Sequence, residues 1–170
     1  MIPGKYGYSC HSTHCTDTIP ELTDEMKLDT SSNNLYRLKK GIMRYFASPG
    51  KLELEIAAFC ERKKIRWALW PQMDRYDVEI QFSDGEIWEI DAKAYRNPIA
   101  LRTKIQNDNG FPDGEYARGY FVIPSEYTVN QQNYTAIVNR ILENQKNVKC
   151  VTLQSLKAEI TRKEDSCCEG

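Results

Sequence analysis

Residues 75–93 read RYDVEIQFSDGEIWEIDAK, and this stretch decides the fold. Polar and apolar side chains alternate over residues 77–82 and again over most of 87–93, as expected of two strands that each bury one face. Ser83, Asp84 and Gly85 separate the two runs, and Gly85 suits the left-handed position of a short loop. The stretch therefore predicts a β-hairpin.

The length of the hairpin loop determines which side chains share a face. A three-residue loop pairs Phe82 with Glu86 and, counting back along both strands, it also pairs Asp77 with Asp91. A two-residue loop would place these two aspartates on opposite faces, and we favour the longer loop. Lys93 lies two positions beyond Asp91 and points the same way. The hairpin is thus expected to bring two carboxylates and one amine together.

This grouping of charges suits metal-dependent hydrolysis. Adjacent carboxylates repel each other unless a cation lies between them, and ligands that offer only oxygen favour Mg²⁺ or Mn²⁺. A bound cation could activate water, which Lys93 would orient or deprotonate. The plainer alternative is an exposed polar strand face, since Asp and Lys two positions apart are common in strands. Because Asp77 matches Asp91 in register, we prefer the functional interpretation.

Around the hairpin, the sequence predicts one α/β domain at residues 34–160, between an irregular polar arm at 1–33 and a disordered tail at 161–170. Helical spacing of apolar residues marks 35–46, 51–64, 98–105, 134–142 and, briefly, 155–160. Extended runs occupy 67–70, 119–123 and 148–153. We expect a central mixed sheet with helices on both sides and the hairpin at one edge of the sheet.

The overall charge argues against a free-standing nucleic-acid-binding protein. The formal net charge is −1, whereas such proteins usually carry a basic surplus. A protein of this charge that acts on nucleic acid needs either a local basic patch or delivery by a partner. The chain has no apolar run of membrane-spanning length and no recognisable signal peptide, so we expect no contact with a membrane and a cytoplasmic location.

The motif itself resembles a known superfamily. Asp77 and the run Asp91-Ala92-Lys93, after a helix that bears Glu53 and Glu55, resemble the PD-(D/E)XK nucleases of the restriction-endonuclease-like fold. Tyr76 departs from the pattern, because the superfamily often has proline there. More narrowly, the chain resembles the endonuclease-like proteins encoded beside prokaryotic Piwi proteins in defence islands. The segments that carry this narrower resemblance are RYFASPGKLELE at 44–55, LWP at 69–71, DRYD at 74–77 and IDAK at 90–93, followed by Pro98.

The resemblance implies a restriction-endonuclease-like core with a Mg²⁺ (or Mn²⁺) site for cleaving DNA. It assigns Asp77 and Asp91 to the metal and Lys93 to catalysis. The backbone carbonyl of Ile90 is a further candidate metal ligand.

The resemblance also implies a carboxylate from the preceding helix, either Glu53 or Glu55. Counting back from the end of the helix favours Glu53 as the catalytic group, and Glu55 stays open as a metal ligand. The implied partners are DNA and a Piwi/Argonaute-like protein, with room for a helicase, in an anti-phage or anti-plasmid defence complex.

Two other functions compete with this interpretation. The first is a catalytically inactive assembly module that binds a Piwi-type partner and nucleic acid. The second is a small interaction protein stabilised by Zn²⁺, because Cys10 and Cys15 flank two histidines and Cys167 and Cys168 could complete a site. Since Cys10 and Cys15 supply only half a site, we favour an unliganded polar arm.

Overall fold

The computed structural model describes residues 2–4, 7–9 and 50–168 of the chain, which divides into two compact units, Met1–Ser48 and Pro49–Gly170. In the first unit, β1 (Ile2–Gly4) and β2 (Gly7–Ser9) form a short antiparallel pair within the predicted irregular arm. The helix predicted at 35–46 and the cysteine and histidine group of the arm lie outside the described residues.

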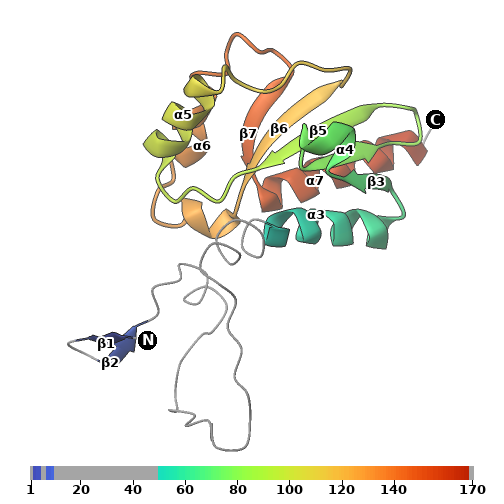
Figure 1. The fold of residues 1–170 in the computed structure, drawn as a ribbon. Coiled ribbons are helices and arrows are strands. Elements are labelled where there is room, and N and C mark those ends of the chain that lie inside the picture. Colours follow the sequence, from blue (N-terminus) through green and yellow to red (C-terminus); the bar gives the residue numbers. More distant parts are fainter. Residues whose placement is uncertain (1, 5–6, 10–49, 169–170) are drawn as a thin grey trace, which may run out of the picture. The chain divides into compact units, whose positions relative to one another are not determined.

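The second unit contains a five-stranded mixed sheet (Figure 1). Its strands, in spatial order, are β3 (Arg66–Leu69), β4 (Val78–Gln81), β5 (Ile87–Ala92), β6 (Arg118–Ile123) and β7 (Val148–Thr152). The pairs β3–β4 and β4–β5 are antiparallel, whereas β5–β6 and β6–β7 are parallel. The predicted α/β class with a central mixed sheet is therefore confirmed, as a restriction-endonuclease-like core requires.

Helices cover both faces of this sheet (Figure 1). Two long helices, α3 (Gly50–Lys63) and α7 (Leu153–Cys168), pack on one face. The helices α5 (Pro98–Asn107) and α6 (Tyr134–Asn139) pack on the other. Two short elements complete the unit, α4 (Pro71–Asp74) and the 3₁₀ helix η2 (Ser125–Thr128). None of the helices in the described part of the chain is both long and apolar enough to cross a bilayer.

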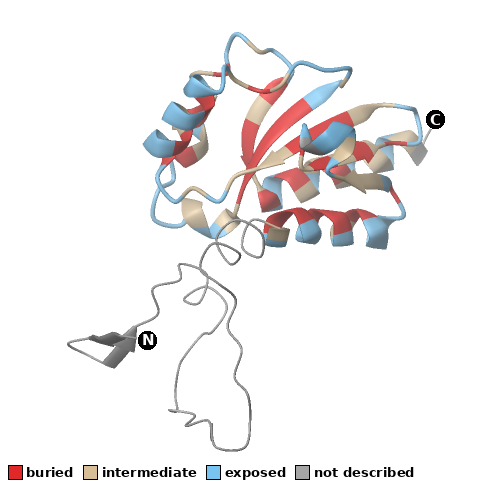
Figure 2. Ribbon diagram, viewed as in Figure 1, coloured by how far each residue is buried: buried red, intermediate tan, exposed pale blue. Residues whose placement is uncertain are grey.

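Each layer of helices encloses its own apolar core (Figure 2). The core under α3 and α7 contains every second residue of the hairpin strands, as the sequence pattern predicted for the buried face. Among these residues are Val78, Ile80, Trp88 and Ile90. The core under α5 and α6 includes Phe121 and Tyr134. The sheet is therefore covered on both faces, and polar side chains of the hairpin are accessible mainly where the strands end.

The predicted hairpin register is confirmed. Val78 pairs with Ile90, and the Phe82 N–H donates to the Glu86 carbonyl over 2.9 Å. Gly85 has a φ of 86°, the left-handed conformation expected for its loop position. The three-residue loop thus sets the same-face grouping that the sequence predicted.

The prediction that the hairpin lies at one edge of the sheet is wrong. Strand β3 lies outside β4, and β6 and β7 lie beyond β5. The cause is the crossover through α5, which returns the chain to pair in parallel with β5. As a result Glu89, on the face expected to be polar, is only 2% exposed.

The prediction of a short helix at 155–160 and a disordered tail from 161 is also wrong as far as Cys168, because α7 continues to that residue. The extra turns are held by ion pairs with the hairpin loop. The Lys163 ammonium lies 2.5 Å from a carboxylate oxygen of Asp84 and 2.5 Å from one of Glu86. Composition alone suggested disorder because these partners are distant in the sequence.

Candidate active site

Asp77 lies at the point where the chain enters β4. Its N–H donates over 3.0 Å to the carbonyl of Ile90, the residue that also lies opposite Val78 in the hairpin. Its carboxylate accepts a 2.7 Å hydrogen bond from the Ala92 N–H. These two bonds hold the Asp77 side chain across the end of β5, beside Asp91.

Lys93 follows the last residue of β5 and is held through both its backbone and its side chain. Its N–H donates to the Val122 carbonyl of β6 over 2.7 Å, and its ammonium lies 2.5 Å from a carboxylate oxygen of Asp91. The side chains of Lys93 and Asp91 are 21% and 18% exposed, so both can reach solvent or substrate. The structure therefore brings together the two aspartates and the lysine that the sequence singled out.

The two candidate glutamates of α3 have different surroundings. Glu53 is buried, and its Oε2 atom finds no hydrogen-bond partner among the described residues. Glu55 is exposed and forms a 2.7 Å ion pair with Lys157 of α7. Of the two, Glu53 is the carboxylate with an unused buried acceptor, whereas Glu55 is already paired with a lysine.

The electrostatics link Glu53 to the hairpin residues. The pKa of Glu53 is raised to about 7, chiefly by burial; a backbone hydrogen bond and Lys93 lower this pKa, and the carboxylates of Asp77 and Asp91 raise it. Burial also raises the pKa of Asp91 to about 7, against the lowering effect of Lys93. Three acids and one amine therefore interact, and burial disfavours the charged forms of Glu53 and Asp91.

The ligand chemistry of this cluster fits a hard divalent cation. A cation would satisfy the unpartnered oxygen of Glu53 and relieve the repulsion among the carboxylates. Within residues 2–4, 7–9 and 50–168, however, no three His, Cys, Asp or Glu side chains already form a closed ligand set. Mg²⁺ tolerates this, because it usually takes one or two carboxylates and keeps several waters. Asp91 is turned toward Lys93, so a cation bound at this carboxylate would share it with the amine.

Ile90 stands apart from the cluster. Its carbonyl oxygen already accepts the Asp77 N–H in the ladder between β4 and β5. The structure thus gives this oxygen a backbone role, unlike the carboxylates of Asp77, Asp91 and Glu53.

A second acidic pair lies on the same hairpin face, as the alternation of side chains in the two strands predicts. Glu79 and Glu89 are directly opposite each other on β4 and β5. Burial, followed by the charge of Glu79, raises the pKa of Glu89 to about 8. The signal that could have revealed the pair is the register itself, which places two like charges opposite each other.

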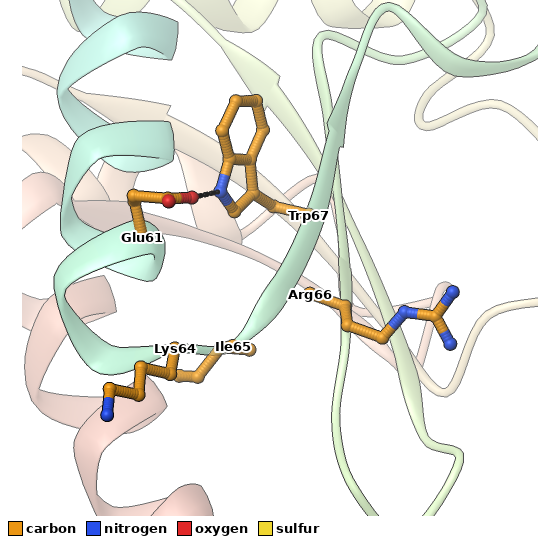
Figure 3. Close-up of a pocket in the computed structure, with 5 residues that line it drawn as sticks. All are labelled: Glu61, Lys64, Ile65, Arg66 and Trp67. Atoms are coloured by element: carbon orange, nitrogen blue, oxygen red, sulfur yellow. Dashed lines mark hydrogen bonds between the residues drawn. The ribbon is translucent and has the colours of Figure 1, made fainter.

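A hollow of about 490 Å³ lies at the turn from α3 into β3 (Figure 3). It is lined by Glu61, Lys64, Ile65, Arg66 and Trp67. Figure 3 shows the indole of Trp67 directed at Glu61, to which its N–H donates over 2.9 Å. This hollow is at the last turn of α3, whereas Glu53 is in the first, so it is separate from the acid cluster.

Residues 50–166 match the model of a family described as "REase associating with pPIWI_RE". The match begins at the first residue of α3 and ends within α7, so it spans the whole sheet and every residue of the acid cluster. No curated protein matches the chain.

Proposed function

Because the chain belongs to the family of restriction-endonuclease-like (REase) domains associating with pPIWI_RE, we propose that it is a nuclease that hydrolyses DNA phosphodiester bonds with Mg²⁺ or Mn²⁺. The observation that carries the proposal is the convergence of Glu53, Asp77, Asp91 and Lys93 from three separate elements. Packing alone does not explain a buried glutamate whose oxygen has no partner beside two further acids.

In this proposal Asp77 and Asp91 hold the cation and Glu53 supports it. When bound, the cation supplies Lewis acidity for the negative charge that develops around phosphorus. Asp77 is suited to its role because the Ala92 N–H fixes its carboxylate beside that of Asp91. Glu53 extends from α3 and adds a third carboxylate to attract the cation. Without that cation, the carboxylates would repel a phosphate.

Lys93 acts on the attacking water and on the phosphate. Its ammonium is held by Asp91 at 2.5 Å, which positions it at the end of β5. From there it can hold the water by a hydrogen bond and offset the charge on a phosphate oxygen. Since the Lys93 side chain is 21% exposed, it can contact substrate without losing its ion pair.

We further propose that the nuclease works with a Piwi-type protein, together with a helicase, in anti-phage or anti-plasmid defence. The description of the family supports the Piwi-type partner. The net charge of −1 supports delivery of DNA by a partner, because the chain has no overall basic surplus to hold DNA alone. The same charge favours the competing function, a catalytically inactive module that binds the Piwi-type protein and nucleic acid.

Cleavage assays separate the two functions. Supercoiled plasmid and single-stranded DNA are incubated with Mg²⁺ or Mn²⁺, with and without the pPIWI_RE protein. We expect cleavage that Asp91→Asn and Lys93→Ala each reduce by about 100-fold or more, because each removes a group that acts on the reacting atoms. Glu55→Gln is the matched control and should cleave as the unchanged protein does. Equal cleavage by all four proteins, or none under any condition, would refute the nuclease.

A further inference from the structure

The turn that leads into the acid cluster has an unusual backbone. Trp70, the residue before α4, has a φ of 50°. Within α4, Gln72 and Met73 have φ values of 54° and 57°. All three are among the five non-glycine residues with positive φ in the part of the chain that the structure describes. Left-handed conformations are disfavoured for such residues and are found where the surroundings or a function maintain them.

Hydrogen bonds fix this turn to the cluster. The Trp70 N–H donates to the Asp77 carbonyl over 3.0 Å, so the start of the turn is bonded to the residue that enters β4. At the other end, the Arg75 N–H donates to the Pro71 carbonyl over 3.3 Å, and the Arg75 guanidinium donates to the Asp113 carbonyl. The position of the turn relative to Asp77 is therefore set by bonds on both sides.

The turn presents large apolar side chains to solvent. Met73 is 99% exposed and Trp70 is 51% exposed, and α4 appears as an exposed segment in Figure 2. Among the residues that the structure describes, the other large apolar side chains that are exposed are Leu54, Ile99 and Val129. All five belong to segments at the end of the sheet where β5 and β6 finish, and this is also the end that carries the acid cluster. Of the five, Trp70 and Met73 belong to the turn whose first N–H is bonded to the Asp77 carbonyl.

We propose that Trp70 and Met73 form a base-contacting wedge, which binds the nucleobases next to the bond that the acid cluster cleaves. This inference rests on the proposed nuclease function and adds its substrate class, DNA whose bases are unpaired or easily unstacked at the cleavage site. An indole can stack on any base, and an exposed methionine can insert between bases. Arg75, which is exposed at the foot of the turn, adds a positive charge suited to the nucleic-acid backbone.

A nucleic acid is a better candidate to contact this turn than the groove of a partner protein. A strand whose phosphate reaches Asp77 comes close to the turn, because the Trp70 N–H donates to the backbone carbonyl of Asp77. The bases on either side of that phosphate then come within reach of Trp70 and Met73. In a fully stacked duplex the faces of these bases are hidden, and the wedge predicts a preference for single strands or for duplexes that are mismatched there.

The test measures binding and cleavage separately. The full chain, alone and with the pPIWI_RE protein, and with Ca²⁺ in place of Mg²⁺, is titrated with a 20-nucleotide single strand and with the matching duplex, each with 2-aminopurine at successive positions. We expect tighter binding of the single strand and a fluorescence change limited to one or two neighbouring positions. The double variant Trp70→Ala/Met73→Ala should bind the strand about 5- to 100-fold more weakly and lose the local signal. Val129→Ala, which removes an exposed apolar group at the same end, is the control and should bind normally.

The milder changes Trp70→Phe and Met73→Gln keep the test valid if the double variant folds poorly. The first keeps a stacking ring, and the second removes an apolar end that packs against nothing, since Met73 is almost fully exposed. Trp70→Phe should keep most of the affinity and Met73→Gln should lower it.

The outcomes distinguish the wedge from the nuclease. Normal strand binding without cleavage under Mg²⁺ would refute only the nuclease, provided the double variant still loses the 2-aminopurine signal. Strand binding by the double variant equal to that of the unchanged protein would overturn the wedge. Loss of pPIWI_RE binding with unchanged strand binding would also overturn it, and would assign the turn to a protein partner. Failure of the unchanged protein to bind either DNA would overturn it as well.

Discussion

Replacing Glu53 by glutamine should stabilise the metal-free protein while removing a support of its proposed metal site. Glu53 is 4% exposed, and its pKa rises from the ordinary value of 4.5 to about 7. The folded protein therefore binds this proton more tightly than the unfolded chain does. The stabilisation of the fold that comes from this tighter proton binding is fully present below pH 4.5 and is lost as the pH rises through about 7. At 1.36 kcal/mol per pH unit, the free energy lost by pH 8 is about 3 kcal/mol.

Glutamine keeps the shape of glutamate but cannot ionise. Glu53→Gln should therefore unfold at a higher denaturant concentration than the unchanged protein at pH 8 in EDTA, with a gain of up to about 3 kcal/mol that shrinks to about 1 kcal/mol at pH 5. The assay is urea unfolding of both proteins at pH 5 and 8, with EDTA or with Mg²⁺. Mg²⁺ should stabilise the unchanged protein more than the variant, because it binds the folded state through the acid cluster.

Glu55→Gln is the matched control for this experiment. Glu55 is exposed and pairs with Lys157, so its loss should change the unfolding free energy by less than about 1 kcal/mol and with little dependence on pH between 5 and 8. The reasoning is refuted if Glu53→Gln is less stable than the unchanged protein at pH 8 in EDTA. It is also refuted if the two proteins differ by the same amount at pH 5 and 8.

Three further substitutions test the packing that positions the site. Gly119→Ala should destabilise the fold by about 1–3 kcal/mol in urea unfolding, because the added Cβ would lie 2.8 Å from an edge carbon of Phe111; an unchanged midpoint would contradict this. Asn139→Ala should cost about 1–3 kcal/mol in the same measurement, since the amide bonds both the N–H and the carbonyl of Cys150 over 2.6 and 3.0 Å; a loss below about 0.5 kcal/mol would contradict it. Lys163→Ala should speed amide hydrogen exchange in the last turns of α7 without slowing cleavage, and unchanged exchange would show that its ion pairs with the hairpin loop do not hold the helix.

The hairpin and its register could be predicted from the sequence because both are set locally. The loop length and the alternation of polar and apolar residues fix the pairing, and Gly85 supplies the conformation that the loop requires. The grouping of Asp77, Asp91 and Lys93 follows from this register and from the period of a strand. These features depend on fewer than twenty consecutive residues, so no knowledge of the remaining fold was needed.

The two glutamates of α3 show where local reasoning weakens. Helical spacing favoured Glu53 but kept Glu55 open, because both lie in the first turns of one helix. The difference arises from how α3 packs: Leu52 and Ile56 enter the core, which turns Glu53 inward and leaves Glu55 to meet Lys157. The rotation of a helix about its axis depends on distant partners.

The remaining differences between prediction and structure also come from contacts that are distant in sequence. The hairpin lies inside the sheet because the chain returns through α5 to pair β6 with β5. The last turns of α7 are ordered by ion pairs between Lys163 and the hairpin loop, which lies about eighty residues earlier. Neither composition nor periodicity contains this information, since a polar helix end and a disordered tail have similar sequences.

Binding of Mn²⁺ to the full chain, measured by calorimetry at pH 8, tests most directly whether these carboxylates form one metal site. We predict saturable binding of about one ion per chain to the unchanged protein and to Glu55→Gln, and loss of that binding in Asp77→Asn and in Asp91→Asn. Binding that survives both aspartate substitutions, or an unchanged protein that takes up no Mn²⁺, would contradict the proposed site.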